Sequence, residues 1–139
     1  MAADNFRSLT AYKKAFALAM EIFQISKKFP KEERYSLTDQ IRRSSRSVCS
    51  CIGEAYRKRQ YEAHFVSKSS DADSENTETR VWLDFANACC YITHEMWNDL
   101  ELKAEEVGKL LNHMIENPQK YSRKVYKRRK HLESQSFRR

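Results

Sequence analysis

The chain has 139 residues, a length that suits one domain and leaves little room for two. Two Gly and two Pro are too few for the turns of a many-stranded β fold, and no apolar run is long enough to cross a bilayer. The net charge is +7, and residues 119–139 alone hold nine Lys or Arg against one Glu, so the basic character belongs to the C-terminal tail and not to the body of the protein.

The first residues, MAADNFRSLTAYKK, lack the apolar core of a secretory signal, so we expect a soluble, cytoplasmic protein. A first helix is predicted from about Ser8 to Lys28, because apolar residues recur there at steps of three and four. They are Ala15, Leu18, Ile22, Ile25 and Phe29, with Tyr12, Phe16, Ala19 and Phe23 beside them. Pro30 cannot continue the hydrogen-bond ladder and ends the helix.

A second helix is predicted from Ser36, because Ser36 and Asp39 resemble a capping box. Its apolar stripe consists of Leu37, Ile41, Ser44 or Ser45, Val48, Ile52 and Ala55. The small residues in this stripe, where a larger core residue would be usual, indicate that a neighbouring helix approaches closely.

The third helix is predicted as one continuous element from about Ala63 to Met96. Its serine-rich first half could be read alone as a loop, but helical spacing is kept by Phe65, Ala72, Thr79, Leu83, Ala86 and Cys90. A fourth helix is predicted to be capped by Asn98 or Asp99 and to end at Asn117-Pro118. Its inward residues are Val107, Leu110, Leu111, Met114 and Ile115.

Short links between these elements favour antiparallel neighbours. The expected fold is therefore all-α: an up-down-up-down four-helix bundle over residues 1–118, followed by a basic tail over residues 119–139. Because the four apolar stripes end before Pro118, we expect the bundle to fold without residues 119–139.

The four cysteines, Cys49, Cys51, Cys89 and Cys90, do not have the spacing of a metal site and are expected to be buried, reduced thiols. The histidines show no HxxxH spacing, and no nucleophile–base pair or phosphate loop is evident. We therefore expect no enzymatic activity and no cofactor or metal. Trp82 lies in a core-like run, which favours packing over base stacking.

Four charged residues are candidates for a structural network: Arg43, Glu54, Glu75 and Glu78. Glu75 and Glu78 are three residues apart and share one helix face. Because half-buried charges must be paired, we expect Arg–Glu pairs within the bundle or across a subunit boundary. A binding role and acid–base catalysis are the alternatives.

Two groups of basic residues are candidate nucleic-acid contacts. The first is Arg42 and Arg46 in the second helix with Arg57, Lys58 and Arg59 in the polar link RKRQYE that follows it, and the second is Lys120, Arg123, Lys124, Lys127, Arg128, Arg129 and Lys130 in the tail. The tail interleaves Tyr121, Tyr126 and Phe137 with its basic residues, a pattern typical of single-strand binders. An ordinary solvated helix face and a solubilising tail are the alternatives. No base-reading motif is visible, so binding would depend on charge and shape.

Several segments, taken together and in order, resemble the 23S rRNA intervening-sequence (S23) protein family. They are FRSLTAYKKAFALA, FPKEERYSLTDQIRRSSRSV, IGEA, HFVSK, ENTETRVWL and CCYI, and the resemblance covers roughly Phe6 to Met114. It implies a homopentameric ring of four-helix bundles without enzymatic activity. The chain is also similar to the accessory protein of diversity-generating retroelements, which binds nucleic acid together with a reverse transcriptase. A reverse transcriptase or another nucleic-acid enzyme is therefore an implied partner.

The sequence thus predicts a non-enzymatic, oligomeric scaffold that binds RNA or DNA through charge. Self-association is also favoured by the first and third helices, whose apolar faces are broader than one bundle needs. The alternative is a protein-binding assembly module without nucleic-acid contact.

Overall fold

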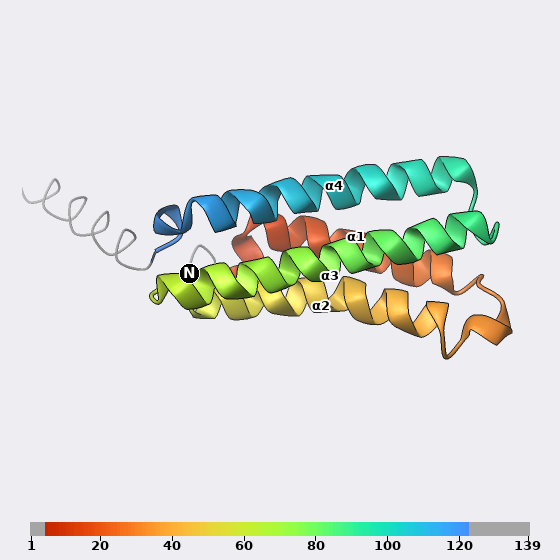
Figure 1. The fold of residues 1–139 in the computed structure, drawn as a ribbon, viewed down its shortest axis with the longest axis horizontal. Helices are drawn as coiled ribbons and strands as arrows, with labels where there is room; N and C mark the ends of the chain where they lie inside the picture. The colour runs from red at the N-terminus through yellow and green to blue at the C-terminus, as the bar shows by residue number, and fades with distance from the viewer. Residues whose placement is uncertain (1–4, 123–139) are drawn as a thin grey trace, which may run out of the picture.

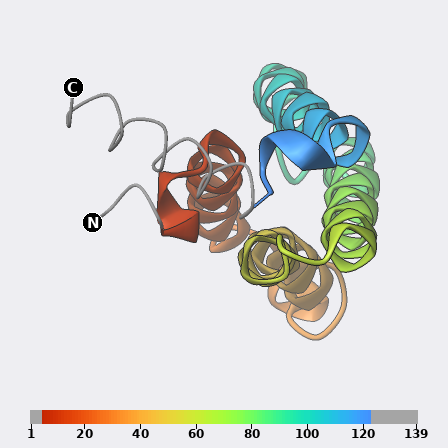
Figure 2. The same cartoon turned by 90° about the vertical axis from the view of Figure 1, so that its left-hand side faces the viewer.

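The computed structural model describes residues 5–122 and shows four long helices (Figure 1). They are α1 (Thr10–Ser26), α2 (Leu37–Arg57), α3 (Glu62–Ala88) and α4 (His94–Glu116), with short 3-10 helices at Phe6–Ser8, Lys31–Glu33 and Pro118–Lys120. Successive helices run antiparallel, and α4 packs back on α1, so that α1 and α3 occupy opposite corners of the bundle (Figure 2). The all-α fold with four helices is confirmed.

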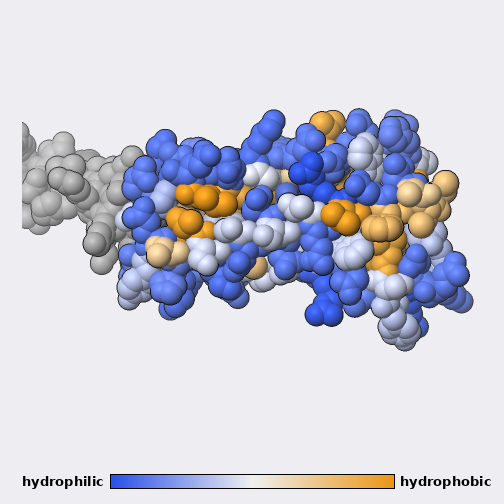
Figure 3. Space-filling model, viewed as in Figure 1, coloured by the Kyte–Doolittle hydropathy of each residue, from blue (hydrophilic) through white to orange (hydrophobic). Residues whose placement is uncertain are grey.

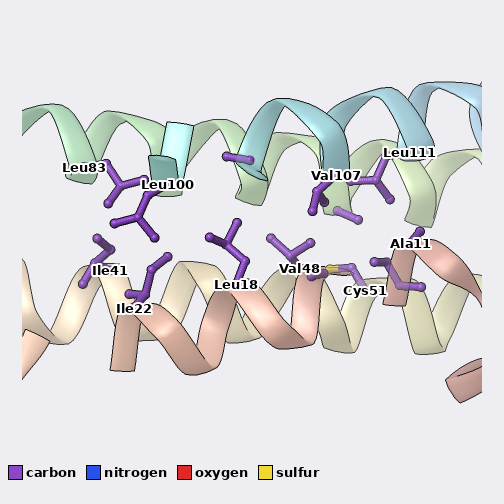
Figure 4. Packing of buried hydrophobic residues seen from close by; sticks show 14 of the residues in the cluster. Ala11, Leu18, Ile22, Ile41, Val48, Cys51, Leu83, Leu100, Val107 and Leu111 are labelled. Atoms are coloured by element: carbon purple, nitrogen blue, oxygen red, sulfur yellow. The ribbon is translucent and has the colours of Figure 1, made fainter. Parts of the chain in front are cut away.

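The core lies between the four helices and runs along the length of the bundle (Figure 4). Each helix contributes apolar side chains at helical spacing, and the most deeply buried include Ile22, Ile41, Ile52, Leu83 and Leu111. Every residue of the stripe predicted for α2 is buried, which confirms that part of the pattern. Burial of a large aliphatic side chain contributes about 1.5–3 kcal/mol, so this core is the main source of stability.

Small polar residues allow α2 and α3 to pack closely. Ser44 and Thr79 are buried where the two helices meet, and the Thr79 hydroxyl donates a hydrogen bond to Ser44 Oγ at 2.9 Å. On the other side of α3, Asn76 Nδ2 donates to the carbonyl oxygen of Ala104 in α4 at 2.9 Å. Buried polar groups are tolerated when they are paired in this way. The serine-rich half of α3 is therefore a helix with one buried face and not a loop.

The predicted third helix is too long, because α3 ends at Ala88 and a turn leads into α4. Cys90 adopts a left-handed conformation with φ of 60°. The amide of Tyr91 donates to the carbonyl oxygen of Ala86 at 2.9 Å, and the amide of Cys90 donates to the carbonyl oxygen of Asn87 at 3.0 Å. These are the two hydrogen bonds of a Schellman motif, which usually places glycine at the left-handed position.

The start of α4 also differs from the prediction. Thr93 is its N-cap, and Thr93 Oγ1 accepts a hydrogen bond from the amide of Met96 at 3.0 Å. The predicted caps, Asn98 and Asp99, lie inside the helix. Threonine at this position satisfies an amide that has no partner within the helix, and this fixes the start of α4 a turn earlier.

Ser36 precedes α2 as predicted, but it does not form the predicted capping box. Its hydroxyl donates to Glu33 Oε1, and the same oxygen accepts a hydrogen bond from the amide of Leu37 at 3.4 Å. The other oxygen of Glu33 accepts one from Tyr91 Oη at 2.9 Å. The hydrogen bonds from Ser36 and Tyr91 lower the pKa of Glu33, and the bond to Glu33 raises the pKa of Tyr91 to about 12. Glu33 thus joins the start of α2 to the α3–α4 turn.

Candidate nucleic-acid interface

Charge is divided between the two halves of the bundle. Residues 5–59, which include α1 and α2, hold thirteen Lys or Arg and five Asp or Glu. Residues 60–116, which include α3 and α4, hold four basic and twelve acidic side chains. A field of this kind attracts a polyanion to the α1–α2 side and repels it from the α3–α4 side.

The outward face of α2 carries a stripe of exposed cations. This basic stripe consists of Arg43, Arg46, Arg57 and Lys58. At about 100° per residue, the three arginines fall within one side of the helix, opposite the buried stripe. The same periodicity is visible in the sequence and indicates that Arg43 lies on this exposed face. The prediction that Arg43 belongs to an interior network did not use it.

The other two predicted contacts, Arg42 in α2 and Arg59 just after it, interact with neighbouring residues of the chain. Arg42 is half-buried, its Nε donates to Ser26 Oγ at 2.8 Å, and its guanidinium lies 4.9 Å from the centre of the Phe23 ring. Arg59 donates from Nη1 to the carbonyl oxygen of Tyr56 at 3.1 Å and lies 4.0 Å over the ring of the same residue. Their charges contribute to the basic side, but their donors are partly used within the chain.

Arg43 does not form the predicted interior network. Its side chain is 75% exposed, and its Nη1 lies 3.8 Å from Asp39 Oδ2, one turn earlier in α2. Glu54 is also exposed and pairs with Lys68 Nζ at 3.0 Å. The reason is the rotation of α2, which turns Ser44 toward the interior and leaves Arg43 outside. Within one chain, Arg43 and Glu54 therefore do not form the expected interior Arg–Glu pair.

Glu75 and Glu78 do lie together on α3, as the spacing predicts. Both are half-buried, and their carboxyl groups share a hydrogen bond. Burial is the first cause of a raised pKa of Glu75, followed by that hydrogen bond and the repulsion between the two groups. Among residues 5–122 neither carboxyl group has an ion pair. Pairing of these carboxyl groups across a subunit boundary stays a prediction.

Most of the predicted tail contacts lie outside the described residues: Arg123, Lys124, Lys127, Arg128, Arg129 and Lys130. Lys120 is described and exposed. Tyr121, which the sequence pattern grouped with the tail, packs on the bundle: its ring stacks on Phe65 with centroids 5.5 Å apart, and its Oη lies 2.8 Å from His113 Nδ1. The packed part of the chain therefore extends beyond residue 118.

The cysteines differ from the expectation in part. Cys51 is buried and Cys49 is half-buried, and burial raises the pKa of the Cys49 thiol to about 11. Cys89 and Cys90 are exposed, because they belong to the turn after α3 and not to its buried face. Within residues 5–122 no cluster of three or more His, Cys, Asp or Glu is placed to hold a metal ion.

Trp82 is half-buried and packs against the core, as predicted. Its ring also lies 5.9 Å from that of Phe85. Among the described residues, no helix combines the length and the apolar character that a membrane span requires.

Comparison with known proteins identifies relatives of the chain. The family model described as 23S rRNA-intervening sequence protein matches residues 7–113. Among solved structures, the chain resembles a protein of unknown function from the S23 ribosomal protein family of Bacteroides thetaiotaomicron VPI-5482. The two are 30% identical with a TM-score of 0.70, over 76% of this chain and 95% of that one. No curated protein matches.

Proposed function

The chain belongs to the 23S rRNA-intervening sequence protein family, and from this premise we propose that it is a non-enzymatic, oligomeric scaffold that binds RNA or DNA through charge and shape. The observation that carries the proposal is the division of charge, with an exposed basic stripe on the positive side. A nucleic-acid enzyme such as a reverse transcriptase is the partner that such a scaffold would serve. The proposed assembly is a ring, with the five copies that the resemblance implies.

The basic stripe is suited to phosphate contacts. Among residues 5–122, its one ion pair joins Arg43 to Asp39, and an exposed pair within a helix is worth only about 0.3–0.5 kcal/mol. Arg57 and Lys58 are exposed and have no ion pair among the described residues, whereas the guanidinium of Arg46 lies 5.4 Å from the centre of the Phe23 ring. Phosphate contacts release counterions and do not depend on base sequence, so we expect strong salt dependence and weak sequence preference.

The C-terminal segment adds to this charge. Residues 123–139 hold eight Lys or Arg and one Glu, a net charge of +7. Because residues 1–122 have eighteen basic and eighteen acidic side chains, nearly all long-range attraction to a polyanion comes from this segment, while the stripe supplies local contacts on the folded surface.

A salt-titrated binding assay with a fluorescent single-stranded RNA, and with DNA of the same sequence, tests the proposal. Arg57→Gln should weaken binding and reduce the slope of log affinity against log salt by about 0.7. Lys109→Gln, which removes an exposed cation from α4 on the acidic side, is the matched control and should leave the slope unchanged.

The nucleic-acid proposal fails if the full chain does not bind at low salt. It also fails if neither Arg57→Gln nor removal of residues 123–139 changes the slope. The better interpretation would then be a protein-binding assembly module without nucleic-acid contact. Exposed apolar side chains such as Phe16 and Phe85 favour this second function. Co-purified nucleic acid, seen as excess absorbance at 260 nm that is lost in high salt, would instead support the first function.

A further inference from the structure

Two exposed apolar patches lie on helices at opposite corners of the bundle (Figure 2). The α1 patch consists of Phe16 and Met20, which are 50% and 45% exposed. The α3 patch consists of Val81 and Phe85, which are 43% and 53% exposed. Each pair is spaced by four residues and so lies on one side of its helix.

In the C-terminal half of α3, apolar residues occur on the outer side of the helix as well as on its buried side. Leu83 and Ala86 are fully buried in the core, Trp82 is half-buried, and the α3 patch faces outward. Apolar side chains also gather over this part of the surface in Figure 3. An apolar patch on the outer side of a helix that already buries its inner side is suited to packing against another surface.

The α1 patch lies between two hollows. One, of about 590 Å³, lies between α1 and α4 and is lined by Met20, Ile25, Met96 and Leu100 among others. The other, of about 530 Å³, lies between α1 and α2 beside Phe16. A surface with two apolar hollows can accept bulky side chains that project from another surface.

The rims of the two patches carry opposite charge. Lys13 and Arg46 are exposed beside the α1 patch. The acidic residues that line the two hollows are already paired: Glu54 with Lys68, and Glu21 and Asp99 with Lys103. Glu78 and Asp84 lie beside the α3 patch, within one turn of Val81 or Phe85. The cation nearest to that patch in α3, Arg80, is already paired with Glu101 of α4 and does not neutralise the acidic rim.

We propose that the α1 patch of one copy of this chain packs against the α3 patch of a second copy, with the basic rim of the first facing the acidic rim of the second. This contact depends on the self-association that is part of the proposed function. The α1 patch and the α3 patch are the surfaces through which the copies would associate. An α1–α1 or an α3–α3 contact would bring like charges together. Because the contact joins two different surfaces, any open assembly keeps one free patch of each kind at its two ends, and it stops growing when these two patches meet and close a ring.

Two variants and a control test the contact by light scattering, with circular dichroism to verify that each variant folds. Phe16→Asp disables the α1 patch, and Phe85→Asp disables the α3 patch. Each variant alone should have the monomer mass of 16.5 kDa, whereas the unmodified chain should have at least twice that mass. Leu102→Asp, at an apolar residue of α4 that is 58% exposed and outside both patches, should associate like the unmodified chain.

Mixing the two variants is the decisive step. Phe16→Asp retains its α3 patch and Phe85→Asp retains its α1 patch, so an equal mixture should form a complex of one copy of each, with twice the monomer mass. If the mixture stays monomeric, the two patches do not contact each other and the inference is overturned. The same follows if either variant alone keeps the mass of the unmodified chain, or if Leu102→Asp is also monomeric.

These outcomes separate the contact from the function on which it rests. An unmodified chain that is monomeric at every concentration contradicts the oligomeric scaffold itself. An unmodified chain that associates while Phe16→Asp or Phe85→Asp associates equally well leaves the scaffold standing and rejects this pair of surfaces. Nucleic-acid binding is measured independently by the salt titration.

Discussion

The neighbouring carboxyl groups of Glu75 and Glu78 make the stability of the bundle depend on pH. The raised pKa of Glu75 means that the folded state holds a proton more tightly than the unfolded chain does. A group whose folded pKa is raised in this way opposes folding at pH values above that pKa, and the penalty disappears as the pH falls through it. The pair therefore destabilises the bundle at neutral pH.

Glu78→Gln should raise the free energy of unfolding at neutral pH, because it removes the repulsion and leaves an amide that can still hydrogen-bond to Glu75. Since both side chains are partly exposed, we expect a gain of less than about 1 kcal/mol. The gain should shrink as the pH falls through the raised pKa of Glu75. Urea denaturation at neutral pH and near the ordinary pKa of glutamate measures both effects.

The control for this substitution is Glu54→Gln. Glu54 is paired with Lys68 and should give no gain when neutralised. A loss of several kcal/mol from Glu78→Gln would contradict the repulsive pair. It would indicate instead that Glu78 holds a buried cation, which would have to come from another subunit.

At the scale of the element, the turn between α3 and α4 depends on an unusual residue. A Schellman motif places its C′ residue in the left-handed region, and here that residue is Cys90, with φ of 60°. A residue with a Cβ atom is strained in this region by about 1–2 kcal/mol, a penalty that glycine does not have. The turn is thus stabilised by its hydrogen bonds and by the contact of Tyr91 with Glu33, against the preference of its own backbone.

Cys90→Gly should therefore stabilise the protein by about 1 kcal/mol, which thermal denaturation can measure. Cys89→Gly is the matched control, because Cys89 is the adjacent residue and has an ordinary negative φ of −82°. This control substitution should not stabilise the protein and should destabilise it slightly. Equal effects of the two substitutions would mean that the loss of a thiol, and not backbone strain, controls stability at this turn.

The same turn shows where sequence reasoning reached its limit. The stripe of α2 was predictable because its apolar and small residues follow one helical period without interruption. The end of α3 was not, because a cysteine occupies the position that glycine usually marks, and apolar residues continue through the turn. The partners of Arg43 and Glu75 depend on how each helix is rotated against its neighbours, and the pattern of a single helix fixes only which residues share a face.

At the scale of the whole molecule, the bundle and its C-terminal segment differ in their balance of basic and acidic side chains. Residues 1–122 are balanced in number of basic and acidic side chains but divided in space, and residues 123–139 are strongly basic. The border between the two parts follows Tyr121 and not Pro118, since Tyr121 packs on Phe65 and lies within hydrogen-bond distance of His113. This position matters for any experiment that removes the basic segment.

Truncation after Ser122 should leave the free energy of unfolding unchanged and should sharply reduce nucleic-acid affinity at low salt. Truncation after Pro118 should reduce affinity in the same way and should also destabilise the bundle by about 1–3 kcal/mol, through loss of the Tyr121 ring from Phe65. Chemical denaturation of the two truncated chains separates these effects. Equal stability would show that Tyr121 contributes nothing to the fold, as the sequence pattern first predicted.

The place where the described chain ends also decides how several copies would present their basic segments. Because the Tyr121 ring stacks on Phe65 near the start of α3, the described chain ends at one defined end of the bundle (Figure 1). In a ring whose copies are related by rotation, that end faces the same side in every copy. All the basic segments would then emerge on one side of the ring, and a single long polyanion could engage several at once. Such multivalent attachment strengthens binding by about 10²–10⁴ without any new type of contact, so a long strand would be held much more tightly than a short one.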